Sequence, residues 1–134
     1  MTLKDVYINN NIQLKDNRGE FFKFMDGNEN FLTKNFGEIY IVTVLPLKIR
    51  AEHYHIIANE WFTVIQGELI ITLEDIKTKI NVEYNLNSSN KSVLFIPSGI
   101  AHKIYNPSLK SESILLAYSS IKYDSKDTKP YIFK

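Results

Sequence analysis

The sequence predicts an all-β protein, a sandwich or small barrel built from many short strands. The chain has 134 residues, about the length of one domain. No window sustains an apolar period of 3.6 residues over four turns, which argues against long helices. Short β-rich segments instead alternate with turn-forming residues, as in sandwiches and barrels. We therefore expect a single domain over residues 1–134.

Eight segments carry the strand pattern. In one of them Leu69, Ile71 and Leu73 share a face, because side chains two residues apart in a strand point the same way. The segment Trp61–Ile65 has large apolar groups on both faces, as expected of a strand inside a two-layer barrel. In chain order the segments are Phe21–Phe24, Glu38–Leu45, Trp61–Ile65, Leu69–Leu73, Lys79–Tyr84, Ser92–Ile96, His102–Tyr105 and Ser113–Ser119.

Composition excludes several classes of protein. A net charge of +1 with interspersed signs gives no footprint for nucleic acid or for an anionic membrane surface. The longest apolar runs are too short to span a bilayer, and no secretory signal follows the first residues. The chain has no cysteine, so neither a disulfide framework nor a thiolate site is available. We expect a cytoplasmic protein.

The three histidines fall in two short stretches. His53 and His55 project together if they lie in a strand, and Glu60 follows after a short turn. His102 comes just after a Pro/Gly turn at Pro97–Gly99. If the three imidazoles and the carboxylate converge, they suit a Zn, Fe, Mn, Ni or Cu ion. They suit proton transfer equally well, because imidazole titrates near neutral pH.

These two stretches resemble the two motifs of the cupin family. The resemblance implies a double-stranded β-helix, a jelly-roll barrel, with all three histidines at motif positions. Lys48 and Lys91 stand near where each motif begins with glycine. The matching residues are His53, His55, Glu60 and Gly67 in the first motif, and Pro97, Gly99, His102 and Asn106 in the second.

Arg18 and Arg50 are the two arginines among sixteen basic residues. A guanidinium is a planar fork suited to phosphate or carboxylate, although two arginines can also be a chance result of a lysine-rich composition. In a regular strand Arg50 would face away from His53, and a bulge or a bend would redirect it.

The sequence around both arginines resembles the sugar-nucleotide branch of the cupins. That branch contains 4-keto-6-deoxyhexose 3,5-epimerases and 3,4-ketoisomerases. The segment Asp16–Phe21 matches an early Asp-x-Arg-Gly-x-Phe pattern, and Arg50–His55 matches Arg-Gly-x-His-Ala-His except at Ala51 and Tyr54. With the segment Leu115–Asp124, which is similar to the last strand and tail of the ketoisomerases, the resemblance covers residues 13–125.

The resemblance implies a 3,4-ketoisomerase that acts on a dTDP-4-keto-6-deoxyhexose in deoxysugar or surface-polysaccharide biosynthesis. Proton transfer between C3 and C4 would pass through an enediolate, with His53, His55 and His102 as the catalytic groups. Arg50, Arg18 and Glu60 would bind substrate, and this hypothesis requires no cofactor.

The main alternative is a metal-assisted 3-epimerase, or 3,5-epimerase, of a dTDP- or UDP-linked 4-keto sugar. The details His53-Tyr54-His55 and Asn59-Glu60 resemble metal-containing cupins that act as 3-epimerases. A divalent metal on the three histidines and Glu60 would stop the histidines from acting as bases, which would leave Tyr40 or another tyrosine of the barrel as the proton carrier. An iron-dependent cupin dioxygenase and a non-enzymatic ligand- or metal-sensing module stay open as well.

The expected partner is a nucleotide sugar, with dTDP preferred over UDP. Tyr7, Phe22 and Phe24 are candidates for stacking on its base, although core positions are expected for most aromatic residues. We also expect a homodimer, in which the strand around Thr2–Asn9 is exchanged between subunits to cover a sheet edge.

Overall fold

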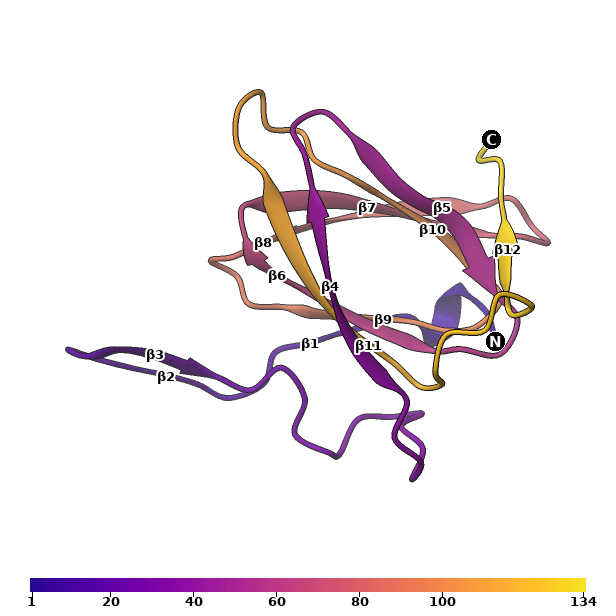
Figure 1. Ribbon diagram of the computed structural model, residues 1–134. Helices are drawn as coiled ribbons and strands as arrows, with labels where there is room; N and C mark the ends of the chain where they lie inside the picture. Colours follow the sequence, from indigo (N-terminus) through magenta and orange to yellow (C-terminus); the bar gives the residue numbers. More distant parts are fainter.

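The computed structural model describes all 134 residues and confirms the all-β jelly-roll prediction. Two five-stranded antiparallel sheets face each other, with the orders β1-β9-β6-β11-β4 and β12-β5-β10-β7-β8 (Figure 1). A third sheet is the hairpin β2-β3. The strands are β1 (Tyr7–Asn9), β2 (Gln13–Asp16), β3 (Gly19–Phe22), β4 (Glu38–Val44), β5 (Ile49–His55), β6 (Glu60–Gln66), β7 (Glu68–Asp75), β8 (Asn81–Asn87), β9 (Val93–Ile96), β10 (Ile100–Tyr105), β11 (Ser113–Ser119) and β12 (Thr128–Pro130).

The helical content is a single 3₁₀ turn, η1 (Leu3–Asp5). Thr2 caps this turn by accepting the Lys4 N–H, while Asp5 accepts the Thr2 N–H in return. The chain contains no helix with the length and apolar character that crossing a membrane requires.

The main core lies between the two large sheets. As predicted from alternation, Leu69, Ile71 and Leu73 of β7 all point inward and are fully buried. They meet Phe62 and Val64 from β6 of the opposite sheet. This layer of branched and aromatic side chains closes the interior at one end of the barrel and leaves the other end for polar groups.

A second apolar cluster explains why Trp61–Ile65 is apolar on both faces. Trp61 and Phe95 lie on the outer face of the first sheet, where the chain before β4 covers them. Tyr7 of β1 stacks on Phe95 with ring centroids 4.8 Å apart, and its hydroxyl accepts the Trp61 indole N–H at 2.9 Å. Phe22 and Phe24 pack against the same cluster. These aromatic residues therefore serve packing, and the structure does not bring them to the candidate site.

Strand β5 contains a bulge, which the sequence pattern allowed but did not predict. Ala51 and Glu52 have φ values of 76° and 57°, in the left-handed region that non-glycine residues rarely occupy. The register with β10 shifts at the same point, because His53 pairs with His102 whereas Ala51 pairs with Lys103. The bulge turns Arg50 to the same side as His53, as the proposed redirection requires.

Four strands were not among the eight predicted segments, namely β1, β2, β5 and β12. Three of them have only three or four residues, too few for a periodic signal. Strand β5 has the sequence IRAEHYH, whose polar side chains and bulge disturb the alternation. Its partners β10 and β12 on either side hold it in the sheet despite that composition.

Gly37 gives a test of how tightly β4 and β11 meet. A Cβ at this position would lie 1.8 Å from the Ser119 carbonyl oxygen, so Gly37→Ala forces two backbones apart. We expect a loss of about 3 kcal/mol in the free energy of unfolding, measured by urea denaturation. Gly27→Ala is the matched control, because Gly27 has open space around it and a φ of 93°, and only about 1 kcal/mol of backbone strain applies. Equal losses in the two variants would contradict this packing.

Candidate functional site

The four residues of the predicted cluster come together at the polar end of the barrel interior. Glu60 begins β6 and points inward with Phe62 and Val64, and His102 points inward between Ile100 and Ile104 of β10. His53 and His55 reach the same place from β5. One ligand atom from each of the four side chains lies within 4.8 Å of every other.

Turns tie these strands together around the site. The Gly99 N–H donates to the His55 carbonyl oxygen at 2.7 Å, and the Asn59 side chain accepts the Ser98 N–H at 2.9 Å. The turn that carries His55 and Glu60 is therefore bonded to the Pro97–Gly99 turn that precedes His102. The positions of the histidines follow from the hydrogen bonds of the backbone around them.

Glu60 is the charged centre of the cluster. Its carboxylate is 2% exposed and accepts a hydrogen bond from the Tyr40 hydroxyl through Oε2. Its Oε1 lies 3.0 Å from His55 Nε2 and 3.3 Å from His102 Nε2. Burial alone would raise the pKa of Glu60, but the contacts with His102 and His55 outweigh it and hold the pKa below its usual range.

Burial and the charge of Glu60 shift the pKa values of the neighbouring side chains His53, His55 and Tyr40. Burial, together with the nearby His102 and His55, lowers the pKa of His53 to about 4, so its imidazole is neutral at pH 7. Burial also acts to lower the pKa of His55, but Glu60 and Asp127 outweigh it and raise that pKa. For Tyr40, burial and then the charge of Glu60 raise the pKa, which keeps the phenol protonated.

His53 differs from the other two histidines in its contacts. His55 and His102 both contact the Glu60 carboxylate, whereas His53 has no carboxylate oxygen within 4 Å. Its ring packs edge-on against His102, with centroids 4.7 Å apart. His53 is also half-buried and lines the cavity, so its imidazole is accessible to a ligand there.

Asp127 is a site residue that sequence reasoning missed. It is buried, and its carboxylate accepts the N–H groups of Ile57 and Ala58 at 2.6 and 3.2 Å. The same carboxylate lies 3.6 Å from His55 Nδ1, and the Thr128 hydroxyl lies 3.3 Å from that nitrogen. Asp127 therefore braces the turn between β5 and β6 and orients the His55 ring. A lone aspartate 72 residues after His55 carries no signal in a single sequence.

The cluster lies in a cavity of about 380 Å³, lined by residues of both sheets and by the segment after β11. Tyr40, Arg50, Glu60 and all three histidines line it, as the sequence led us to expect for one site. The structure does not bring Arg18 to the cavity. Arg18 lies in the turn of the β2-β3 hairpin, which extends away from the barrel, and it pairs with Asp16 at 2.6 Å (Figure 1).

The side chains of the cluster also fit a divalent metal ion. Three buried atoms, Nε2 of His55, Nε2 of His102 and Oε1 of Glu60, lie close together yet form no well-aligned hydrogen bond. Buried polar atoms are rarely left without a partner, and imidazole nitrogens with a carboxylate oxygen are common ligands of transition metals. Asp127 and Thr128 at His55 Nδ1 are outer-shell partners of the kind that orient such a ligand.

The chain has the jelly-roll fold of the RmlC epimerases, which confirms the fold that the resemblance in the sequence implied. Residues 14–131 match the family model of the polysaccharide biosynthesis C-terminal domain, and the chain belongs to that family. A relative with a curated description is the spore coat polysaccharide biosynthesis protein SpsL of Bacillus subtilis, 33% identical over 92 residues. That alignment covers 65% of this chain and 60% of the length of SpsL.

Solved structures of sugar-nucleotide enzymes share this fold. The dTDP-6-deoxy-D-glucose-3,5-epimerase RmlC of Legionella pneumophila, in complex with dTDP-4-keto-L-rhamnose, is 19% identical with a TM-score of 0.84, over 97% of this chain and 74% of its own. A dTDP sugar isomerase of Desulfovibrio desulfuricans is 18% identical with a TM-score of 0.85, over 98% and 86%. The sugar 3,4-ketoisomerase QdtA of Thermoanaerobacterium thermosaccharolyticum, in complex with TDP, is 19% identical with a TM-score of 0.79, over 95% and 88%.

The brace formed by Asp127 predicts a measurable loss of stability. Asp127→Ala leaves the N–H groups of Ile57 and Ala58 without their acceptor, and Ala58 is buried. We expect the free energy of unfolding to fall by about 2–4 kcal/mol, measured by urea denaturation. Asp124→Ala in the same segment is the control, because Asp124 is exposed, and about 0.5 kcal/mol is expected there. If both variants lost the same small amount, the proposed brace would be wrong.

Proposed function

We propose that the chain is an isomerase of nucleotide-linked 4-keto sugars that moves a proton at the carbon beside the ketone. The main support for this proposal is the convergence of three imidazoles and one carboxylate in a cavity of about 380 Å³. A cavity of this size accepts a hexose ring, and its titratable groups suit proton transfer. Membership in a polysaccharide-biosynthesis family and the fold shared with dTDP-sugar enzymes support the same substrate class.

The chemistry starts from the acidity that the C4 ketone gives to the proton on C3. The neutral His53 imidazole accepts that proton while the C–H electron pair forms the C3=C4 double bond of an enediolate. Tyr40 remains a protonated phenol in the same cavity and can return a proton. Transfer of the hydroxyl proton from the C3 oxygen to the C4 oxygen, followed by return of a proton to C4, gives the 3-keto isomer with a C4 hydroxyl. Return to the opposite face of C3 gives the epimer.

The first outcome, 3,4-ketoisomerisation of a dTDP-4-keto-6-deoxyhexose, is the function we favour. His53 supports it, because this imidazole lines the cavity and is free of carboxylate contacts. Burial makes His53 a weaker base than free imidazole but keeps it in the neutral form that accepts a proton. Arg50, on the same side of β5, is placed to bind an anionic part of the substrate.

Metal-assisted 3-epimerisation is the second candidate. The unpartnered buried atoms of His55, His102 and Glu60 favour it, because a divalent ion held by them and His53 would satisfy all three. Such an ion would polarise the substrate ketone and stabilise the enediolate. His53 would then be a ligand, and a tyrosine that lines the cavity, Tyr40 or Tyr123, would carry the proton.

One incubation in D₂O separates the two candidates. The protein is mixed with dTDP-4-keto-6-deoxyglucose and the product is followed by NMR, with and without prior treatment by a chelator. We expect the carbonyl to move from C4 to C3, deuterium to appear at C4, and the chelator to have no effect. His53→Asn should slow turnover by about 100-fold or more, because it removes the base.

Other outcomes of this incubation have defined meanings. A product that keeps the C4 ketone and is inverted at C3, formed only without the chelator, supports the metal-assisted epimerase. In that case Glu60→Gln should lose the bound ion when metal content is measured on the same sample. If no 4-keto sugar nucleotide is converted, whether linked to dTDP or UDP, the proposed function is wrong.

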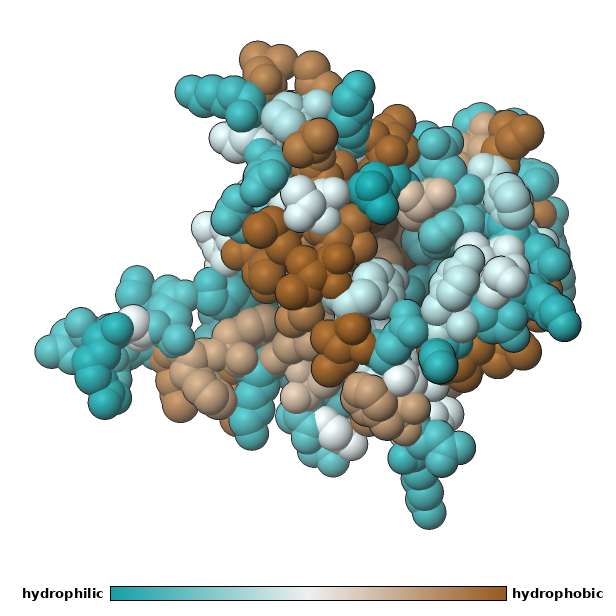
Figure 2. Space-filling view, in the orientation of Figure 1, coloured by the Kyte–Doolittle hydropathy of each residue, from teal (hydrophilic) through white to brown (hydrophobic).

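We also propose a homodimer, as the sequence led us to expect. Strand β1, the segment expected to be exchanged, pairs with β9 of the same chain in this structure. Strand β4 is an edge of its sheet and exposes Ile39 and Ile41, within an apolar patch over β4 and β11 (Figure 2). An uncovered apolar edge strand favours association, and a second copy of the chain would cover it.

Sedimentation velocity tests this dimer. We expect the wild-type protein to sediment as a dimer, and Ile39→Lys to shift it toward the monomer by placing a charge on the patch. Ile132→Lys is the matched control, because Ile132 is 92% exposed and lies near the C-terminus, outside β4 and β11. A wild-type monomer at micromolar concentration would contradict the proposal.

A further inference from the structure

Residues 131–134, which follow β12, cross the second large sheet as an extended segment that we call the strap. Its first N–H, that of Tyr131, donates to the Glu52 carbonyl oxygen at 2.9 Å. Tyr131 and Phe133 are half-buried, whereas Ile132 between them is 92% exposed. This alternation means that one side of the strap faces the sheet and the other faces solvent.

The two half-buried rings of the strap contact the sheet behind the histidine cluster. Tyr131 packs edge-on against Tyr54 with ring centroids 6.1 Å apart, and its hydroxyl accepts a hydrogen bond from Lys79 at 3.0 Å. Lys103 Nζ lies 4.9 Å from the centroid of the Phe133 ring. Tyr54 stands between the two histidines of β5, and Lys103 directly follows the histidine of β10. Because side chains alternate across a sheet, the strap lies on the face opposite the cavity.

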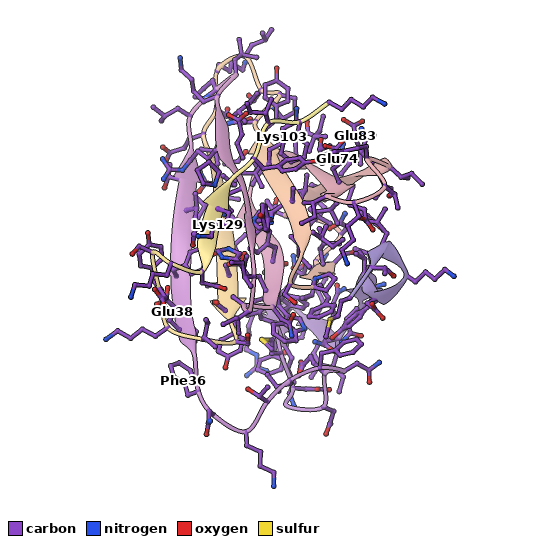
Figure 3. All side chains as sticks on the ribbon, turned by 90° about the vertical axis from the view of Figure 1, so that its right-hand side faces the viewer. Phe36, Glu38, Glu74, Glu83, Lys103 and Lys129 are labelled. Carbon is purple, nitrogen blue, oxygen red and sulfur yellow. The ribbon has the colours of Figure 1, made fainter.

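Glu74 of β7 is a buried carboxylate next to the strap that the proposed chemistry does not use. It is fully buried, its Oε1 has no hydrogen-bond partner, and the Lys134 N–H reaches its Oε2 only at 3.4 Å. No lysine or arginine nitrogen lies within 4 Å of either oxygen. Figure 3 shows Glu74 close to Lys103, whose ammonium instead packs on the ring of Phe133. Covering an unpaired carboxylate is costly, so Glu74 opposes closure of the strap.

The strap also meets the bulge in β5. The φ values of Ala51 and Glu52, 76° and 57°, persist in non-glycine residues only where the surrounding structure holds them. The pairing of β12 with β5 ends at His53, and the Tyr131 N–H extends it by one bond to the Glu52 carbonyl, inside the bulge. Since the bulge turns Arg50 to the cavity side of β5, a contact on the outer face holds a group inside the cavity.

We propose that Tyr131 and Phe133 are positioning residues, which act on the cavity by holding the strap against the β5 bulge. The strap has a closed state, in which the bulge is held, and an open state, in which Glu74 regains water. In the open state the bulge relaxes toward a regular strand, where Arg50 faces away from His53. The proposal concerns the protein without substrate and does not rest on the proposed function.

Hydrogen exchange of the Tyr131 N–H, followed by NMR, measures opening of the strap. We expect Phe133→Ala to speed this exchange by about 10-fold or more, because the packing on the sheet and the contact with Lys103 are lost. Ile132→Ala is the matched control in the same strap, because its side chain points to solvent, and a change of less than about twofold is expected. Equal effects of the two variants would overturn the proposal.

Glu74→Gln tests the opposing role of the buried carboxylate. A neutral amide costs less to cover than an unpaired carboxylate, so we expect exchange of the Tyr131 N–H to slow by about fivefold or more. A merely structural role of Glu74 predicts the reverse, because the variant would then loosen this part of the protein. Faster exchange in Glu74→Gln would therefore overturn this part of the proposal.

The NMR chemical shifts of Ala51 test whether the strap holds the bulge. A positive φ displaces the Cα and Cβ shifts from those of a regular strand. We expect the double variant Tyr131→Ala/Phe133→Ala to move the Ala51 shifts toward strand values, and Ile132→Ala to leave them unchanged. The double variant Tyr131→Phe/Phe133→Tyr should keep the wild-type shifts, because both rings remain on the sheet. Unchanged Ala51 shifts in a variant whose strap exchanges faster would overturn the positioning role.

A turnover assay distinguishes failure of this inference from failure of the proposed function. If no 4-keto sugar nucleotide is converted but the exchange and shift results hold, the strap stands and the proposed function fails. If conversion occurs and Tyr131→Ala/Phe133→Ala leaves both kcat/KM and the Ala51 shifts unchanged, the strap is overturned and the function stands. Thermal melting shows whether each variant is folded, and Phe133→Ala and Glu74→Gln decide the proposal if the double variant is not.

Discussion

The buried carboxylate of Glu60 is the constraint on which the site depends. An ionised carboxylate that is 2% exposed is costly unless several groups satisfy it. The Tyr40 hydroxyl donates a hydrogen bond to it, and the His55 and His102 rings lie 3.0 and 3.3 Å from its other oxygen, on three different strands. The Glu60 carboxylate therefore gathers a phenol and two imidazoles from both sheets at the polar end of the barrel.

The bulge in β5 and the hydrogen bonds of Asp127 position different side chains around the Glu60 carboxylate. The bulge at Ala51 and Glu52 brings Arg50 to the side of His53, so the guanidinium and the imidazole line one cavity. The brace at Asp127 fixes the turn between His55 and Glu60 and orients one imidazole ring. The bulge strains the backbone at Ala51 and Glu52, and the brace buries the Asp127 carboxylate. Such local costs in stability are typical of functional sites, where the position of a side chain matters more.

The barrel and the histidine cluster could be predicted because their signals are local. Leu69, Ile71 and Leu73 alternate within one strand, and both histidine stretches match short motifs. The groups that complete the cavity depend on long-range pairing, which one sequence does not reveal. Asp127 meets His55 only because β12 pairs with β5. Arg18 matched a local pattern, yet the hairpin that carries it extends away from the barrel in this chain.

The pairing of β12 with β5 also has a consequence for the order of assembly. The last contacts of the site come from residues 127–130, whereas the strands that enclose the core are complete by Ser119. Pairing β12 with β5 closes the long stretch of chain between them. The conformational entropy lost in that closure is offset by the contacts of the finished barrel. In refolding from the denatured state, the core is therefore expected to be buried before His55 is ordered. A chain that has formed the barrel but not this pairing would lack the contact of Asp127 with His55.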